Sequence, residues 1–184
     1  MNILQSIQQL DGEILLLIQQ YLRMDMLTPF MKSVTFLGNG GWFWILCAVV
    51  LLAVPKTRKT GYAAALSLIF GAIVTNLLLK NIVARPRPFA EIEALIPMIT
   101  KPKDFSFPSG HTTASFAVAL VMLRMLPKKF GIPAVVLAAL VAFSRLYLGV
   151  HYPTDVLTGF VIALVGSMLS VWIVRTKPED KQVH

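Results

Sequence analysis

The sequence predicts an all-α membrane protein: a polytopic bundle of five transmembrane helices that follows an N-terminal amphipathic region at the membrane interface. Two observations support this prediction. The 184 residues are 56% hydrophobic and only 14% charged, whereas an average soluble domain has about 25% charged residues. The apolar residues are also grouped into long runs separated by short polar turns, as membrane-crossing helices require. The length fits a single domain, residues 1–184, and no internal repeat is evident.

Residues 1–38 do not form an uninterrupted apolar segment, because charged and amide residues recur every few positions. Apolar residues recur instead at helical spacing, at Leu10, Ile14, Leu17, Ile18 and Tyr21. This pattern predicts one or two amphipathic helices that lie at the interface and end at the glycine-rich turn 38–41. A short sixth span in this region is the alternative.

The transmembrane core is expected over residues 42–175. Its five apolar runs cover about 42–54, 62–79, 112–126, 132–148 and 155–174. Between the second and third runs lies the longest polar connection, residues 81–110, which holds five of the eleven prolines. The other connections are short, so consecutive spans should pack as antiparallel neighbours.

Charge predicts which side of the membrane each connection faces. The segments 56–59, 124–129 and 175–181 carry nine basic residues and two acidic ones, and the positive-inside rule therefore makes them cytoplasmic. The connection 81–110 then lies on the extracytoplasmic face. The net charge of +8 falls at the ends of apolar runs, which favours anionic lipid over nucleic acid as a partner. We expect a multi-pass protein of the cell membrane that binds no nucleic acid.

The segment SRLYLGVHYPTD, residues 144–155, places ionisable side chains between two apolar runs, where they are costly to keep. Pro153 fits the first position of a helix, so Asp155 would lie in the first turn, four residues after His151. The carboxylate can then fix the imidazole tautomer and leave the other ring nitrogen free as a nucleophile or base. Arg145 suits phosphate binding. A simple helix-capping pair explains this segment equally well on its own.

A second stretch, KNIVARPRP at residues 80–88, should reach the same membrane face. Lys80, Arg85 and Arg87 gather there at the end of the second apolar run. Taken alone, such a cluster more commonly extends its side chains towards lipid headgroups.

A third stretch, FPSGHTT at residues 107–113, opens the third apolar run. Ser109 can cap the helix that follows, and Gly110 lets the backbone approach an anion at the helix N-terminus. His111, in the first turn, is placed to protonate a leaving oxygen. An ordinary cap with an incidental histidine is the alternative for this motif by itself.

Together the three stretches supply what phosphoryl transfer needs when no metal is available. They combine cations and a helix N-terminus for the phosphate with one histidine to attack, one to protonate and an acid to orient the attacker. The acidic residues show no spacing typical of Mg²⁺ or Zn²⁺ ligands. We therefore expect no metal and no cofactor.

The signatures K-x6-RP (80–88), PSGH (108–111) and SR-x5-H-x3-D (144–155) resemble, in order and at every signature position, those of the type-2 phosphatidic acid phosphatase superfamily. The resemblance implies a helical core with a phosphate pocket shared with vanadium haloperoxidases and glucose-6-phosphatase. It implies that His151 forms a phosphohistidine, that Asp155 orients it and that His111 protonates the leaving group. The phosphate oxygens would be held by Lys80, Arg87, Arg145, Ser109 and Gly110.

The chain resembles the small bacterial members of this family that act on undecaprenyl pyrophosphate or phosphatidylglycerophosphate. We expect a metal-independent lipid phosphatase, and favour undecaprenyl pyrophosphate because an outward pocket suits a carrier released on that side. Phosphatidylglycerophosphate and phosphatidic acid are the alternative substrates. A lipid phosphotransferase, a vanadate-dependent peroxidase and a non-catalytic lipid-phosphate binding or transport protein are the other hypotheses. The acid–base residues argue against the last, and the hydrophobic chain argues against the peroxidase.

Overall fold

The computed structural model describes residues 3–176, which form helices and contain no β-strand. Besides the α-helices, the chain has two π-helical segments, Ile18–Leu22 and Ile73–Leu79, and two 3₁₀ turns, Asn39–Gly41 and Pro55–Thr57. The predicted all-α fold class is confirmed. The α-helices are α1 (Ile3–Leu17), α2 (Leu27–Leu37), α3 (Trp42–Ala53), α4 (Arg58–Ala72), α5 (Lys80–Val83), α6 (Pro88–Glu91), α7 (Gly110–Met125), α8 (Lys128–Tyr147) and α9 (Pro153–Thr176).

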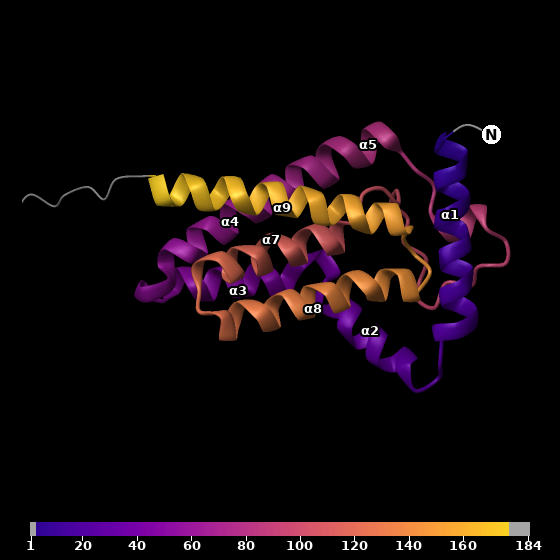
Figure 1. Cartoon of the computed structure of the whole chain (residues 1–184), viewed down its shortest axis with the longest axis horizontal. Coiled ribbons are helices and arrows are strands. Elements are labelled where there is room, and N and C mark those ends of the chain that lie inside the picture. Colours follow the sequence, from indigo (N-terminus) through magenta and orange to yellow (C-terminus); the bar gives the residue numbers. More distant parts are fainter. Residues whose placement is uncertain (1–2, 177–184) are drawn as a thin grey trace, which may run out of the picture.

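Helix α7 is the central element of an elongated bundle that also contains α3, α4, α8 and α9 (Figure 1). It contacts all four of these helices, and its residues Ala117, Val118, Ala119 and Val121 have no exposed surface. Small side chains at these positions let the neighbouring helices approach closely, as is common where helices pack in membranes. The PSGH motif at the start of α7 is therefore held in the middle of the bundle.

Three helical stretches are long and apolar enough to cross a membrane on their own: Pro55–Glu91, α8 and α9. Helices α2 and α3 meet the same criteria as a pair, with a bend of 44° between them. Helix α7 has 16 residues, so at 1.5 Å per residue it is about 24 Å long, less than a hydrocarbon core of about 30 Å. The structure thus supports three or four spans, and the count of five stays a prediction.

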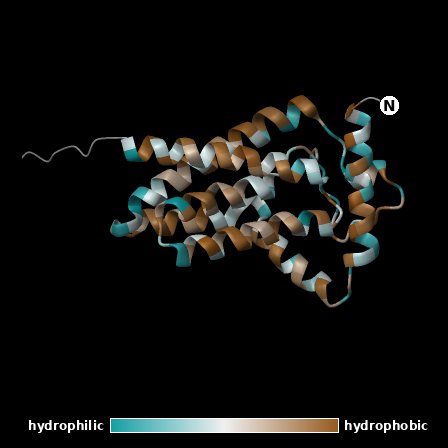
Figure 2. Ribbon diagram, in the orientation of Figure 1, coloured by the Kyte–Doolittle hydropathy of each residue, from teal (hydrophilic) through white to brown (hydrophobic). Residues whose placement is uncertain are grey.

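The outer surface of the bundle is apolar. Hydrophobic residues run along its helices, and hydrophilic residues gather near the helix ends (Figure 2). Ile69, Val136, Val165 and Trp172 are among the large hydrophobic side chains that are exposed. A continuous exposed apolar surface of this kind marks contact with another apolar phase, which for such helices is the bilayer.

Helix α1 lies across one end of the bundle, not alongside the other helices (Figure 1). Its buried face carries Asp11 and Leu15, and Ile18 continues that face. Beside that face, the helix exposes an apolar stripe made of Ile3, Ile7, Leu10, Leu17 and Tyr21. Two helices, α1 and α2, occupy the region for which one or two were predicted, and their position at a membrane interface stays a prediction. The predicted apolar stripe is divided, because Ile18 is buried while Leu10 and Leu17 are exposed.

The second predicted span runs further than expected. The helix does not end at Lys80 but continues through it to Val83, after a π-helical stretch from Ile73 to Leu79. Ala84, at φ 46°, then adopts a left-handed conformation that ends the helix. π-Helical turns are frequent at functional sites, and this one ends directly before Lys80.

Candidate active site

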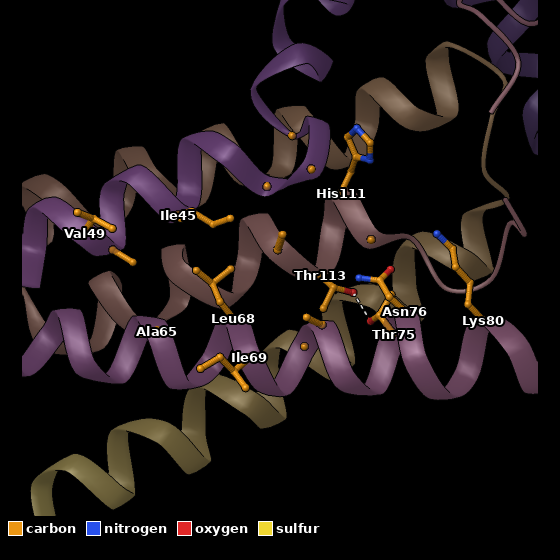
Figure 3. A pocket seen from close by; sticks show the side chains of 18 of the residues that line it. Ile45, Val49, Ala65, Leu68, Ile69, Thr75, Asn76, Lys80, His111 and Thr113 are labelled. Atoms are coloured by element: carbon orange, nitrogen blue, oxygen red, sulfur yellow. Dashed lines mark hydrogen bonds between the residues drawn. The ribbon is translucent and has the colours of Figure 1, made fainter. Parts of the chain in front are cut away.

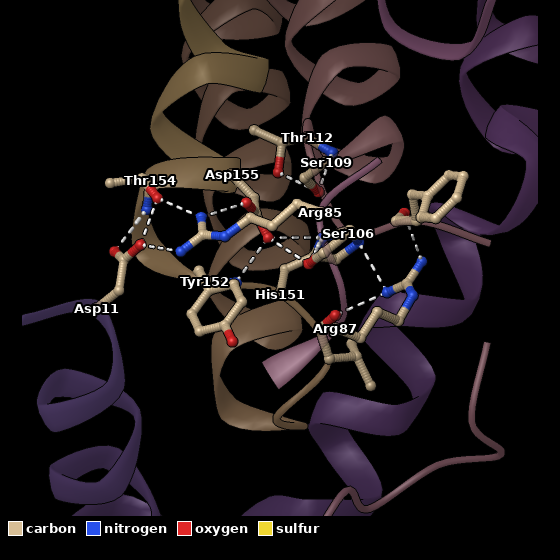
Figure 4. Close-up of polar contacts among 12 residues, drawn as sticks. Asp11, Arg85, Arg87, Ser106, Ser109, Thr112, His151, Tyr152, Thr154 and Asp155 are labelled. Atoms are coloured by element: carbon tan, nitrogen blue, oxygen red, sulfur yellow. Dashed lines mark hydrogen bonds and ion pairs between the residues drawn. The ribbon is translucent and has the colours of Figure 1, made fainter. Parts of the chain in front are cut away.

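The turn between α8 and α9 brings His151 against Asp155. Gly149 adopts φ 72° after the end of α8, a conformation that glycine takes without strain, and Pro153 is the first residue of α9, as predicted. Nδ1 of His151 lies 3.4 Å from Oδ2 of Asp155, so the predicted pair is confirmed. The buried Asp155 carboxylate also accepts hydrogen bonds from the Ser106 hydroxyl and from the Tyr152 backbone N–H (Figure 4).

The other ring nitrogen of His151 faces a cation. Its Nε2 lies 3.3 Å from Nη1 of Arg87, and because a guanidinium only donates, Nε2 accepts and the ring proton sits on Nδ1, towards Asp155. Burial lowers the pKa of His151 to about 4, with the charges of Arg145 and Arg87 acting in the same direction and Asp155 opposing them. The imidazole is therefore neutral at pH 7, the state that a nucleophile requires.

Arg87 and Lys80 share one acidic partner, Asp104. Arg87 donates from Nη2 to Oδ1 of Asp104 at 2.7 Å and from Nη1 to the carbonyl of Val150 at 2.7 Å, and Lys80 pairs with the other carboxylate oxygen. Burial acts to raise the pKa of Asp104, but the hydrogen bonds and charges of Lys80 and Arg87 outweigh it and hold that pKa well below its ordinary range. Asp104 is therefore an anion already held by two of the predicted phosphate-binding residues.

Arg145 approaches the same region from the end of α8. It is buried, donates from Nη1 to the Thr35 hydroxyl of α2, and its Nε has no hydrogen-bond partner among the described residues. An unpaired buried donor costs free energy. This donor is thus available for an anion that enters the site.

The start of α7 forms as predicted. The Ser109 hydroxyl accepts a hydrogen bond from the Thr112 backbone N–H at 3.4 Å, which confirms the predicted cap, and it is buried. Gly159 of α9 lies so close that a Cβ there would come 2.8 Å from the Ser109 carbonyl oxygen. His111 lies in the first turn, and its Nε2 is 2.9 Å from Oδ1 of Asn39. Because that oxygen only accepts, Nε2 carries the proton.

One cavity of about 590 Å³ collects most of the predicted site residues. Asp155 and Ser109 are not part of its lining and lie buried behind it. Lysines outside the three motifs, Lys32, Lys101 and Lys103, line the cavity as well. The predicted residues that line it are Lys80, Arg87, Gly110, His111, Arg145 and His151.

An apolar groove of about 560 Å³ adjoins this polar cavity. It runs between α3, α4 and α7 (Figure 3), where Ile45, Val49 and Leu68 form part of its walls. Lys80 and His111 line both the groove and the polar cavity. The site therefore joins a cationic chamber to an apolar channel.

Several residues around the site were not identified from the sequence. Asn39 and Thr35 contact His111 and Arg145 from the bent pair α2–α3, and no local pattern marks them. Asp11 and Arg85 form ion pairs beside Asp155. The sequence held a signal for both residues. Arg85 lies inside the second motif. Asp11 is an acidic residue within an amphipathic helix, and a charged side chain needs a partner if it is buried.

Within residues 3–176, no three His, Cys, Asp or Glu side chains come together as they would around a metal ion.

Comparison with known proteins identifies the family. Residues 60–179 match the model of the PAP2 superfamily. The chain is 36% identical over 148 residues to an undecaprenyl-diphosphatase of Sulfolobus acidocaldarius, covering 79% of this chain and 71% of that protein. It is 34% identical over 176 residues to phosphatidylglycerophosphatase B of Bacillus subtilis, covering 89% and 81% respectively.

The fold agrees with these matches. The crystal structure of a transmembrane PAP2-type phosphatidylglycerolphosphate phosphatase from Bacillus subtilis superimposes with a TM-score of 0.77 at 28% identity, covering 96% of this chain and 90% of that one. Together with the apolar helices, this neighbour indicates a membrane protein. The chain belongs to the PAP2 superfamily and is a phosphatase of that family.

Proposed function

We propose that this phosphatase removes the terminal phosphate from a membrane lipid phosphate or diphosphate through a phosphohistidine on His151. The observation that carries the proposal is the junction of the cationic cavity with the apolar groove at Lys80 and His111. A substrate with a phosphate at one end and a hydrocarbon chain at the other matches both parts. The hydrocarbon tail of such a lipid would lie in the apolar groove, while its phosphate headgroup would enter the cationic cavity.

In the proposed mechanism, Lys80, Arg87 and Arg145 hold the phosphate oxygens, and the backbone of Gly110 at the N-terminus of α7 adds partial positive charge. Ser109 supports this site by capping the helix. These charges offset the negative charge of the phosphoryl group as it is transferred. The unpaired Nε of Arg145 is one donor that an incoming phosphate would satisfy.

Nε2 of His151 attacks phosphorus, and the bond from phosphorus to the leaving oxygen breaks. The negative charge of the bound phosphate favours the imidazolium form of His111, which gives one proton to that oxygen and is left neutral. Asp155 accepts from Nδ1 and stabilises the charge that the ring gains. Water then attacks the phosphohistidine, with His111 removing its proton, and releases inorganic phosphate.

Among lipids, we favour undecaprenyl diphosphate. Lys32, Lys101 and Lys103 line the cavity in addition to the three motif cations, and a diphosphate carries more negative charge for them to neutralise than a monophosphate does. Relatives named undecaprenyl-diphosphatase from Sulfolobus acidocaldarius and Bacillus subtilis share 36% and 37% identity with this chain. Phosphatidylglycerophosphate is the second candidate, supported by the relative named phosphatidylglycerophosphatase B.

We further propose that the site opens on the extracytoplasmic face of the cell membrane. The predicted site residues that line the cavity share one chamber, and the basic clusters 56–59, 124–129 and 175–181 lie in connections that alternate with theirs along the chain. The positive-inside rule assigns those clusters to the cytoplasm.

The test is phosphate release by the purified protein in detergent with excess EDTA. Undecaprenyl diphosphate, phosphatidylglycerophosphate and phosphatidic acid are compared, with His151→Ala as the control. Release that survives EDTA and is lost in the variant supports the metal-independent histidine mechanism, and the order of the rates selects the lipid. Full activity of the folded His151→Ala protein would overturn the mechanism.

A further inference from the structure

The guanidinium of Arg85 lies between two carboxylates, one of them the acid of the His151–Asp155 pair. Its Nη1 is 2.9 Å from Oδ1 of Asp155, and its Nη2 is 2.8 Å from Oδ2 of Asp11 (Figure 4). The Asp155 and Asp11 side chains are 0% and 3% exposed, and that of Arg85 is 16% exposed. The arrangement is a nearly buried acid–base–acid chain that joins α1 to α9.

Asp11 also holds the start of α9. Its Oδ1 accepts a hydrogen bond from the Thr154 backbone N–H at 3.1 Å, and its Oδ2 accepts one from the Thr154 hydroxyl. A carboxylate at a helix N-terminus satisfies free N–H groups and interacts favourably with the helix dipole. Asp11 caps the helical turn that carries Asp155. Helix α1 therefore helps to fix the position of Asp155, although α1 lies outside the bundle of α3, α4, α7, α8 and α9.

Arg85 is held on other sides as well. Its Cζ lies 3.7 Å from the centre of the Tyr152 ring, and its Nη1 donates to the Thr154 hydroxyl at 2.7 Å. It does not line the phosphate cavity. Arg85 therefore has no contact with a phosphate in that cavity, and among the three proposed catalytic residues it touches Asp155.

We propose that Asp11 and Arg85 are positioning residues of this phosphatase: they hold Asp155, and through it His151, so that α1 has to be docked on the bundle for catalysis. This inference rests on the proposed role of His151 as the nucleophile. A carboxylate that orients an attacking histidine sets its tautomer and direction, and a buried carboxylate that loses its cation is destabilised.

The exposed side of α1 indicates which medium surrounds the docked helix. The exposed stripe of Ile3, Ile7, Leu10, Leu17 and Tyr21 runs along α1 beside the buried face that carries Asp11. An amphipathic helix across the end of a membrane bundle places such a stripe in the lipid interface. Helix α1 thereby connects the bilayer surface to the catalytic pair.

The experiment measures kcat and KM of Asp11→Asn and Arg85→Gln with the lipid that the wild type hydrolyses fastest. Both variants should lose kcat by roughly 10- to 100-fold, the scale known for partners that orient metal-ligating side chains. KM should stay within about twofold because the phosphate-binding cations are untouched. Arg85→Lys keeps the charge and should recover part of the loss. Combining Asp11→Asn with Arg85→Gln should cost little more than Arg85→Gln alone, since both act through one chain of contacts.

Glu13→Gln is the matched control. It removes a carboxylate from the same helix, but Glu13 is exposed and its carboxylate accepts from the Gln9 side chain; its kcat should equal that of the wild type. Wild-type kcat in both Asp11→Asn and Arg85→Gln, or an equal loss in Glu13→Gln, would overturn the inference. A rise in KM at unchanged kcat would do so too, because it would assign these residues to binding. His151→Ala tests the proposed mechanism separately. If His151→Ala is inactive while Arg85→Gln is fully active, the positioning role of Arg85 is rejected and the proposed mechanism stands.

Discussion

Replacing Asp104 by asparagine should strengthen the binding of inorganic phosphate at the active site. The carboxylate pairs with Lys80 and Arg87, two of the residues proposed to hold the substrate phosphate, so phosphate has to displace it or share its partners. Asp104 is 53% exposed, and ion pairs open to water are worth about 0.2–1 kcal/mol each. Two such pairs amount to about 0.4–2 kcal/mol. Because about 1.4 kcal/mol corresponds to a tenfold change in affinity, the dissociation constant of phosphate should fall about 2- to 25-fold.

The assay is the inhibition constant of orthophosphate, measured at neutral pH against hydrolysis of the lipid in detergent micelles. Glu93→Gln serves as the control, because it removes one negative charge from an exposed position of the same connection outside the polar cavity. Its inhibition constant should change little. Weaker phosphate inhibition in Asp104→Asn than in the wild type would refute the reasoning, since it would mean that Asp104 holds the two cations in place for the phosphate instead of competing with it.

Three further predictions concern His151, Gly38 and the apolar groove. With the pKa of His151 lowered to about 4, kcat/KM should not fall between neutral pH and about pH 5 and should decline only below that, as the ring gains the proton that blocks attack; an acid limb near the ordinary histidine value of 6.5 in the pH profile would contradict this. Gly38→Ala would place a Cβ 2.6 Å from Cδ2 of His111 and 2.8 Å from Cγ1 of Val141, so the imidazole must move and kcat should fall about tenfold or more; an unchanged kcat would show that the ring adapts. Leu68→Trp should fill part of the groove and raise KM for a long-chain lipid without changing hydrolysis of a short, soluble phosphate ester, and equal losses with both substrates would argue against the groove as the chain-binding site.

The sequence was sufficient to predict the site wherever chemistry and local geometry coincide. His151 and Asp155 are four residues apart and meet because the turn before Pro153 leads directly into the first turn of α9. Ser109 caps α7 because its hydroxyl can reach the Thr112 N–H. The two helices of the N-terminal region and the long connection before α7 also followed from composition and spacing.

The remaining features depend on tertiary packing and have no local pattern. The π-helical stretch before Lys80 lies inside a uniformly apolar run, so hydropathy could not predict where the α-helix changes to a π-helix. The bend between α2 and α3 sets Asn39 beside His111, 72 residues away along the chain. In the sequence, Asp11 only interrupts an apolar pattern. Its ion pair with Arg85 depends on the packing of α1 across the end of the bundle.

The segment that matches the PAP2 model begins at residue 60, yet residues before it contact three ionisable side chains at or beside the site. Asp11 pairs with Arg85, the Thr35 hydroxyl accepts from Arg145, and Asn39 accepts from His111. The first 59 residues are therefore not an interchangeable membrane anchor attached to a self-sufficient enzyme. A chimera that joins a different N-terminal segment to this motif region would keep every signature residue, but it would lose these three partners unless the new segment supplied them. Conversely, substitutions in α1 and α2 offer a way to tune the enzyme while its motifs stay unchanged.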